Sequence, residues 1–431
     1  MQVSLEREEG LERTLRVDIP ADRIDSAVND KLNQLARNVR LDGFRPGKVP
    51  LRVVRNRFGG EVRQEVVSEI MQSSLQEAIG QQELRPAGAP SVEANDNDDG
   101  GVTVRATFEV VPEIEVTGLG GVEIEKPVAE VTDADVDNMV ETLRKQRQTF
   151  NDVERPAAQG DQIVIDYVGR IDGEAFEGGS GEDTPVELGA GRMIDGLEEG
   201  MEGMTAGDTR TIDVTFPEDY QAAELAGKTA QFEVTAKAVQ EPQLPAVDEE
   251  FVHGFGIQSG DIDELRASLR QNMERELKQT LRTRVKEKVL NALLENNDIA
   301  VPTPMVNEEI GRMREEMKQR LGGQVPDDRL GDDMFRTEAE RRVKLGLLLA
   351  EVIRRGELRA DPDRVQAQIE ELASSYEDPA QVIQYYSENR EARSGVEAMV
   401  VEDQAVDHLL AEAEVSEQPS DFDTVMQRTT G

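Results

Sequence analysis

The stretch QIVIDYVGRI, residues 162–171, places apolar side chains at alternate positions. Two further stretches, TRTIDVTF at 209–216 and AQFEVTAKAV at 230–239, share this alternation, and the chain between the three stretches is rich in glycine. A period of two is typical of strands that bury one face. Residues 160–239 are therefore predicted to form a compact, antiparallel, β-rich domain.

The chain before this β-rich segment mixes strands with helices. Residues 3–20 alternate around a turn at Glu9-Gly10, and residues 91–111 alternate around an acidic, glycine-ended turn, so both predict β-hairpins. Between the hairpins, apolar residues recur every three or four positions, which predicts two helices. Residues 113–149 are predicted to be an extended connector that leads into a short helix.

The chain after the β-rich segment is predicted to be almost wholly helical. A stripe of apolar residues repeats every four positions from Leu265 to Val285, which predicts one long helix. Further helices are predicted to begin near Pro304, Thr337, Asp361, Pro379 and Ser394. The fold class is thus multidomain α+β, with an all-α C-terminal domain. The predicted domains are residues 1–112, 113–149, 150–242 and 243–431.

Composition narrows the classes of function. A chain of 431 residues suggests about three domains. There is no cysteine, so disulfides and thiolate sites are excluded, and no apolar run is long enough to span a membrane. The net charge of −40 argues against general binding to DNA or other nucleic acid. The first residues lack the apolar core of a signal peptide, and we expect a cytoplasmic protein.

Common cofactor and metal sites find little support in the sequence. His253 and His408 lack the spacing of a zinc site, and the acidic turn at residues 95–106 ends in alanine where a calcium loop needs a carboxylate. The glycine-rich segment 188–196 lacks the spacing and the Lys-Ser/Thr ending of a phosphate loop. We predict no cofactor and no metal.

One segment reverses the charge of the chain. Residues 31–63 hold nine Lys and Arg residues against only Asp42 and Glu61, and at their centre lies the loop GFRPGKVP, residues 43–50. Glycine and proline favour a tight loop, and Phe44 beside Arg45 suits a protein–RNA surface. An ordinary solvated loop, with Phe44 tucked into the core, is an equally good interpretation of these residues alone.

The central segment resembles the FKBP-type prolyl isomerases. The resemblance covers about residues 150–240 and depends on three ordered motifs, DYVGRIDGEAFE, VELGAGRMIDGLEEGM and FPEDY, followed by Phe232. It implies a bent antiparallel sheet around a short helix, and an apolar catalytic pocket. The residues that it assigns to this pocket are Tyr167, Phe176, Met193, Ile194, Leu197, Tyr220 and Phe232. Taken singly, each of these aromatic residues is more often a core residue than a site residue.

An apolar pocket is sufficient for this chemistry. Rotation about an X–Pro bond is opposed by amide resonance, and the twisted amide is less polar than the planar one. A desolvating wall therefore favours the twisted state without any acid or base. The resemblance adds the Ile194 N–H as the donor to the prolyl carbonyl, and a hydroxyl from Tyr220. It departs from the family at Leu197, where an aromatic floor is usual, and at Asp195, where related chaperones have proline.

The loop at residues 43–50 resembles the ribosome-docking signature of the trigger factor family, and the order of segments along the whole chain agrees with that family. The resemblance implies a chaperone that docks through Phe44, Arg45, Gly47 and Lys48 to the large ribosomal subunit near the exit tunnel. It implies nascent and unfolded polypeptides as partners, and helical arms that hold them. It leaves a homodimer away from the ribosome open. Pro46 stands where some members have lysine.

The sequence leaves several alternatives open. Met305, Met313, Met317, Met334 and Met399 suit adaptable client contacts, but ordinary helix packing explains any one of them equally well. For the whole chain, the alternatives are a free-standing FKBP-type isomerase and an acidic assembly factor that binds folded proteins.

Overall fold

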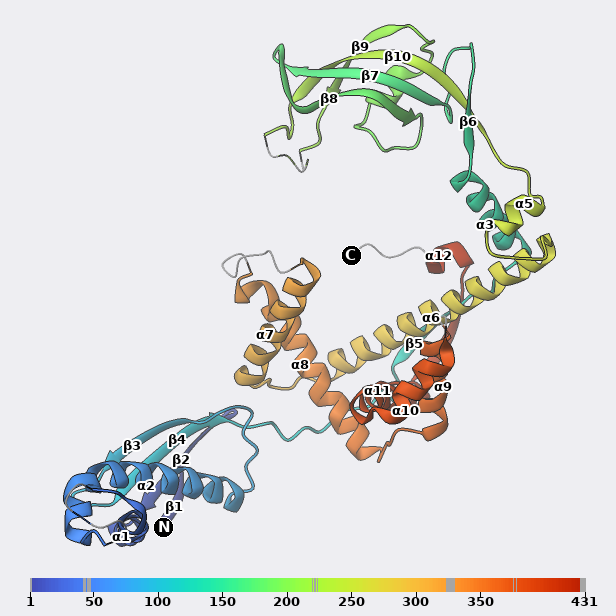
Figure 1. Ribbon diagram of the computed structural model, residues 1–431. Coiled ribbons are helices and arrows are strands. Elements are labelled where there is room, and N and C mark those ends of the chain that lie inside the picture. The colour runs from blue at the N-terminus through green and yellow to red at the C-terminus, as the bar shows by residue number, and fades with distance from the viewer. Residues whose placement is uncertain are drawn as a thin grey trace. The chain divides into compact units, whose positions relative to one another are not determined.

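The computed structural model describes residues 2–41, 44, 48–218, 220, 222, 224–322, 330–374, 376 and 378–426. Two compact units are present, Met1–Lys126 with Thr283–Gln418, and Pro127–Arg282 with Pro419–Gly431. The multidomain α+β fold class is confirmed, with an N-terminal sheet, a central antiparallel sheet and a helical C-terminal region (Figure 1). The boundaries of the four predicted domains stay predictions.

The N-terminal region is one sheet with two helices. The sheet has the order β1-β2-β4-β3 and is antiparallel, with bounds β1 Gln2–Glu9, β2 Glu12–Ile19, β3 Ser91–Asp96 and β4 Val102–Glu109. Both predicted hairpins are therefore confirmed. The predicted helices are α1 (Ala21–Asn38) and α2 (Leu51–Gln81).

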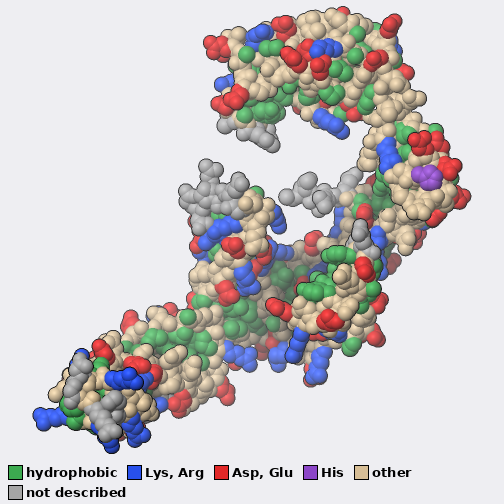
Figure 2. Space-filling view, in the orientation of Figure 1, with side chains coloured by type: hydrophobic (Ala, Val, Ile, Leu, Met, Phe, Trp, Pro, Cys, Tyr) green, Lys and Arg blue, Asp and Glu red, His purple; other side chains and the backbone are tan. Residues whose placement is uncertain are grey.

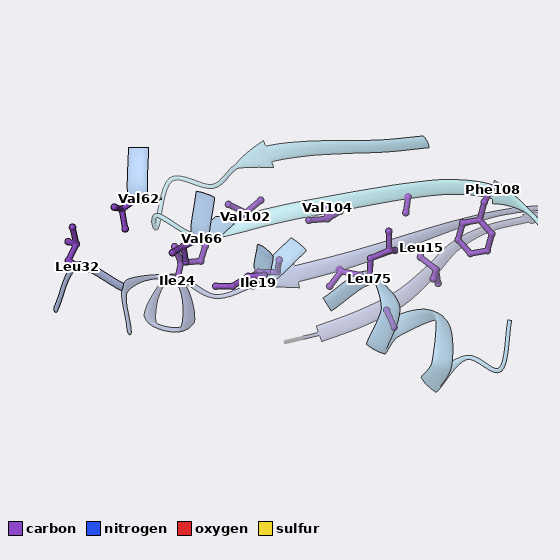
Figure 3. Close-up of a cluster of buried hydrophobic side chains, with 14 of the residues drawn as sticks. Leu15, Ile19, Ile24, Leu32, Val62, Val66, Leu75, Val102, Val104 and Phe108 are labelled. Carbon is purple, nitrogen blue, oxygen red and sulfur yellow. The ribbon is translucent and has the colours of Figure 1, made fainter. Parts of the chain in front are cut away.

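The core of this region lies between the sheet and the helices. Alternate residues of β2 and β4 are buried, as Leu15 opposite Ala106 and Val17 opposite Val104 show. Ile24 of α1 and Val66 of α2 pack into the same cluster (Figure 3). The period of two in the strands and the helical period in α1 and α2 thus meet in one apolar layer.

The helical region of the first unit begins within α6 (Ile262–Asn296) and continues through α7 Thr303–Arg320, α8 Asp332–Arg355, α9 Pro362–Ala373, α10 Pro379–Glu388 and α11 Arg390–Glu412. Proline occupies the first turn of α7, α9 and α10, where its missing N–H costs no hydrogen bond. The expected start of α8 near Thr337 is wrong by about a turn, because Asp332 and Asp333 begin the helix and Phe335 is already buried in it.

The second unit contains the central sheet. Its strands run β6-β10-β7-β8, and β9 pairs with the same strand β10. Their bounds are β6 Thr149–Asp152, β7 Gln162–Ile171, β8 Glu174–Glu187, β9 Thr209–Thr215 and β10 Thr229–Gln243. The short helix α4 (Leu197–Met201) buries Leu197 and Met201 against the sheet. The predicted β-rich domain is confirmed.

Smaller helices of this unit pack on the N-terminal part of α6. They are α3 Asp133–Gln146, α5 Glu249–His253 and α12 Phe422–Met426. Helix α3 begins with a capping box, in which Thr132 and Asp135 each accept a hydrogen bond from the other's backbone N–H. Among the described residues, no helix combines the length and the apolar character that a membrane span requires.

One small sheet was not predicted. Strand β5 (Glu123–Val128), within the supposed connector, pairs with β11 (Glu414–Pro419), within the supposedly all-helical segment. Both strands are short, β11 is mostly exposed, and the two strands lie far apart in sequence. Neither strand therefore carries the strong alternation that makes a strand visible in sequence.

Candidate functional site

The central sheet, α4 and the adjoining loops enclose a hollow of about 390 Å³. All seven residues predicted for the pocket line it, and we call it the central hollow. Tyr167 comes from β7, Phe176 from β8, and Phe232 from β10. Met193 and Ile194 lie on the loop before α4, Leu197 begins α4, and Tyr220 follows β9.

The aromatic rings of the central hollow touch one another in sequence-distant pairs. The Phe176 ring lies edge-on to the Phe232 ring, with centroids 6.1 Å apart and an interplanar angle of 89°. Tyr167 lies 6.1 Å from Phe232 between centroids. Such tilted and edge-to-face pairs are favourable arrangements of aromatic side chains. The rings therefore hold one another in place.

Phe216 belongs to the same cluster, although the sequence prediction did not include it. Its ring lies 4.8 Å from that of Tyr220 and 6.0 Å from that of Phe176, centroid to centroid. The side chain lines the central hollow and is only 2% exposed. The available signal was its position at the start of the motif FPEDY, four residues before Tyr220.

Packing and lining are not alternatives for these residues. Leu197 and Phe232 are 2% and 4% exposed and belong to the core cluster, yet both form the floor of the hollow. Tyr167, Phe176, Met193 and Ile194 are half-buried, and Tyr220 is exposed. The floor residues thus belong to the core and line the hollow at once, while the rim remains open to a ligand.

Glycine makes room for the rings on the sheet. A Cβ atom built at Gly169 would lie 2.6 Å from the Phe232 ring, and one at Gly179 would lie 2.7 Å from the Phe176 ring. Real Cβ atoms do not approach so closely, so any other residue at either position would displace a ring. Gly169 and Gly179 therefore allow the two rings to lie against the sheet.

The central hollow has few charges. Of the described residues that line it, only Arg192 and Asp195 carry a charge, and both are exposed. The Ile194 N–H has no hydrogen-bond partner within the described part of the chain. The hollow can therefore desolvate an apolar ligand and offer it one backbone donor, but its described residues present no buried acid or base.

A second surface of interest lies at the end of the N-terminal region, where Figure 2 shows Lys and Arg side chains gathered. Phe44 is 39% exposed, so it does not tuck into the core. Lys48 is exposed as well, while Arg45, Pro46 and Gly47 lie outside the described residues. Six exposed cations make up what we call the basic face: Arg37, Arg40, Lys48, Arg52, Arg55 and Arg57.

The structure divides the eight described basic residues of this segment into two groups. Lys31 bonds to Glu65 and Glu69 at 3.0 and 2.6 Å, and Arg63 lies 3.8 Å from Asp25. These carboxylates raise the pKa of Lys31, chiefly through the hydrogen bond that Lys31 donates to Glu69. Within the described residues, the six cations of the basic face have no ion-pair partner, so their charge is available to a ligand.

Other candidates from the sequence have internal explanations. In the acidic turn, Asp99 accepts a hydrogen bond from the Gly101 N–H, and Asn97 accepts one from the Thr103 hydroxyl. His253 and His408 are exposed or nearly so, and each lies near a glutamate one helical turn away. No group of three potential ligands suited to a metal ion occurs among the described residues.

The five methionines that the sequence offers as client contacts form two sets. Met305, Met313 and Met317 pack against the buried cluster of α7 and α8, so helix packing is their role there. Met334 and Met399 are 64% and 45% exposed. Only these two are free to contact another chain, together with exposed aromatic residues such as Tyr376 and Tyr385.

Comparison with known proteins covers the whole chain. The family model of the bacterial trigger factor protein matches residues 1–143, and that of its C-terminus matches residues 261–411. The model of FKBP-type peptidyl-prolyl cis-trans isomerases matches residues 153–237, which include all seven predicted pocket residues.

Curated relatives agree with these matches. The trigger factor of Thioalkalivibrio sulfidiphilus is 49% identical over 99% of this chain and 98% of its own length. That of Shewanella woodyi is 47% identical over 100% of this chain and 99% of its own. A solved structure of the trigger factor chaperone covers 96% of this chain at 19% identity, with a TM-score of 0.47.

Proposed function

We propose that this chain, which belongs to the trigger factor family, docks in the cytoplasm on the large ribosomal subunit near the exit tunnel and holds emerging polypeptides. It is a chaperone with an FKBP-type peptidyl-prolyl cis-trans isomerase domain. The observation that carries the proposed site of isomerisation is the convergence of seven predicted side chains on the central hollow.

The geometry of the hollow suggests how isomerisation proceeds. A prolyl ring enters over the floor formed by Leu197 and Phe232, and the aromatic walls exclude water from the X–Pro amide. Since the planar amide loses more solvation there than the twisted one, the rotation barrier of about 18–20 kcal/mol falls. The Ile194 N–H donates to the prolyl carbonyl, and the Tyr220 hydroxyl contacts the peptide at the rim.

The basic face supports docking to the ribosome. Six exposed cations without internal carboxylate partners match the phosphate groups of ribosomal RNA, and phosphate contacts supply affinity without reading sequence. Phe44, exposed beside them, supplies an apolar anchor for ribosomal protein or for an unstacked base. Arg45 and Gly47 are assigned to docking by family resemblance.

Client binding is assigned to the helical region. Met334, Met399, Tyr376 and Tyr385 are exposed there among charged side chains. Flexible methionines and scattered aromatic residues bind varied apolar segments weakly, and weak contacts allow release. A homodimer away from the ribosome stays a prediction, which sedimentation velocity would test.

Two measurements test the proposal. Replacement of Phe44, Arg45 and Lys48 by alanine should abolish co-sedimentation with ribosomes, whereas alanine at Arg7, Arg13 and Arg16, which form ion pairs on the sheet, should not. Unchanged co-sedimentation of the first variant would favour a free-standing isomerase.

The second measurement is proline-limited refolding of a model substrate. The full-length chain at catalytic concentration should accelerate the slow phase that reports X–Pro isomerisation. An unaltered slow phase would contradict the proposal that the central hollow isomerises X–Pro bonds.

A further inference from the structure

The glycine-rich segment 188–196 folds around a single carboxylate. Glu198, the second residue of α4, accepts four backbone hydrogen bonds. Its Oε2 accepts from the N–H of Gly189 at 2.9 Å and of Gly191 at 3.2 Å, and its Oε1 from the N–H of Arg192 at 2.9 Å and of Met193 at 3.0 Å. N–H groups that converge in this way form an anion-binding concavity. The segment therefore binds an anion, as phosphate loops do, but the anion is a side chain of the same protein.

Glycine is required for this arrangement. Gly189 and Gly191 have φ angles of +86° and +65°, in the left-handed region that other residues rarely adopt. A Cβ atom at Gly191 would meet no atom within 4 Å, so the requirement there is conformational and not steric. The two glycines turn successive N–H groups toward one point.

The Glu198 carboxylate remains charged in this environment. Its partial burial would raise the pKa, but the hydrogen bonds from the four N–H groups outweigh burial and hold the pKa below its ordinary value of 4.5. Hydrogen bonds to an ionised acceptor are stronger than those between neutral groups. The only other hydrogen bond from an N–H of residues 189–193 that the described chain shows is a long one, 3.4 Å from Ala190 to the Glu187 carbonyl.

The loop held by Glu198 forms one wall of the central hollow. Met193 is the last of the four donors and lines the hollow, and Ile194 follows it in the same wall. Glu198 itself lines a smaller hollow of about 220 Å³, which shares Met193, Ile194 and Asp195 with the central hollow, but it does not line the central hollow. Its carboxylate can therefore act on a ligand in the central hollow through the loop that it holds and not by direct contact.

We propose that Glu198 is the positioning residue of the isomerase site. By holding the backbone from Gly189 to Met193, its carboxylate sets the Met193 and Ile194 side chains in the wall. It also leaves the Ile194 N–H, the next in the run, free to donate to the prolyl carbonyl. This inference rests on the proposed function of the central hollow.

The main test is Glu198→Gln in the full-length chain. The glutamine amide has nearly the same shape, but its NH₂ group cannot accept hydrogen bonds from N–H groups. We expect kcat/KM for a short peptide with one Phe-Pro bond to fall about 10- to 100-fold, since small displacements of positioning groups have effects of this size. Glu199→Gln removes the same charge from an exposed neighbour and should leave kcat/KM within about twofold.

NMR distinguishes positioning from general destabilisation. In Glu198→Gln, the amide proton resonances of Gly189, Gly191, Arg192 and Met193 should move upfield, because they lose a charged acceptor. Resonances of β7 and β10 should stay at their wild-type positions, whereas the midpoint of thermal unfolding should fall modestly, because hydrogen bonds to a charged acceptor are lost. If the sheet resonances shift together with the loss of activity, Glu198 has a general structural role and the inference is wrong.

A second variant disturbs the same loop through its backbone conformation. Gly191→Ala strains the positive φ angle without touching Glu198, and it should reproduce the kinetic loss. The double variant should be no worse than either single one, because both act through one loop. Gly203→Ala, which introduces the same kind of strain at φ +78° in an exposed turn, is the control and should keep its activity.

The outcomes distinguish the inference about Glu198 from the proposed isomerase function. If Glu198→Gln and Gly191→Ala both keep kcat/KM within about twofold of wild type, the inference is overturned while the isomerase function stands. If the unmodified chain does not catalyse the reaction at all, the proposed function itself fails.

Discussion

The central hollow and the basic face are suited to different ligands, the first through apolar side chains and the second through exposed positive charge. The hollow is concave and has only Arg192 and Asp195 as charged described lining residues, whereas the basic face consists of six exposed cations around an exposed phenylalanine. In the isomerase domain, cations meet carboxylates, as Lys237 does with Asp166 and Asp183. On the basic face, the described cations have no such partners. An acidic protein can thus be selective in where it leaves positive charge uncompensated.

The largest expected difference between the two regions is their response to salt. If the six cations contact phosphates, raising salt from about 50 to 200 mM should weaken ribosome binding about 10³-fold, because counterion release scales with the number of contacts. Isomerisation of a short neutral peptide should hardly change over the same range. Co-sedimentation and a peptide assay in one salt series measure both. A flat ribosome-binding curve would show that docking does not depend on the basic face.

A core substitution should affect the hollow in two ways at once. Phe232→Ala removes a floor residue that is also buried core, so we expect the free energy of unfolding to fall by about 3–5 kcal/mol and isomerase activity to be lost. Denaturant unfolding and the peptide assay measure the two effects.

Val234→Ala is the matched control for this variant. It removes buried volume two residues along the same strand without touching the hollow, and it should lower stability but keep kcat/KM. Loss of activity in this control would mean that the hollow is sensitive to any core damage. Ribosome binding should be unaffected in both variants.

The smallest expected effect concerns a charge inside the isomerase domain. Asp161 is 3% exposed and bonds to both terminal nitrogens of Arg155, at 2.6 and 2.9 Å, and to the Ala158 N–H. Burial alone would raise its pKa, but these partners hold the pKa below the ordinary value of 3.8. Asp161→Asn should lower the free energy of unfolding by about 2 kcal/mol at pH 7, the scale of a hydrogen bond to a charged group.

The pH dependence of this effect has a definite sign. Because the folded-state pKa of Asp161 is lowered, its contribution is fully present above the unfolded pKa and disappears as pH falls through the folded one. The difference between wild type and Asp161→Asn should therefore be constant near neutrality and shrink below about pH 4. Urea unfolding at several pH values measures it, and a difference that persists in acid would contradict the assignment.

Sequence was most informative where local pattern and function coincide. The alternation of residues 162–171 predicted β7, and the ordered motifs predicted the seven residues that meet in the hollow. The sequence was least informative for strands and ion pairs whose partner lies far away along the chain. Strands β5 and β11 are short and far apart in sequence, and the pairing of Lys31 with Glu65 and Glu69 depends on how α1 packs on α2. Neither relation leaves a periodic signal in the chain.

Glu198 illustrates a different limit. In a chain with 89 acidic residues, no sequence rule distinguishes one carboxylate from the others. The glycine-rich segment before it lacks the spacing of a phosphate loop, so the sequence predicts no nucleotide site there. Only the backbone conformation at Gly189 and Gly191 reveals that four N–H groups share one acceptor.

The pairing of β6 with β10 has a consequence for the architecture of the gene product. Thr149 lies opposite Gln243 in this ladder, so the polypeptide enters and leaves the isomerase domain at neighbouring points. A domain whose two ends lie close together can be inserted into a loop of another protein with little disturbance of either. Evolution could therefore exchange, trim or delete the catalytic module and close the gap with a short turn, without rebuilding the chaperone that carries it.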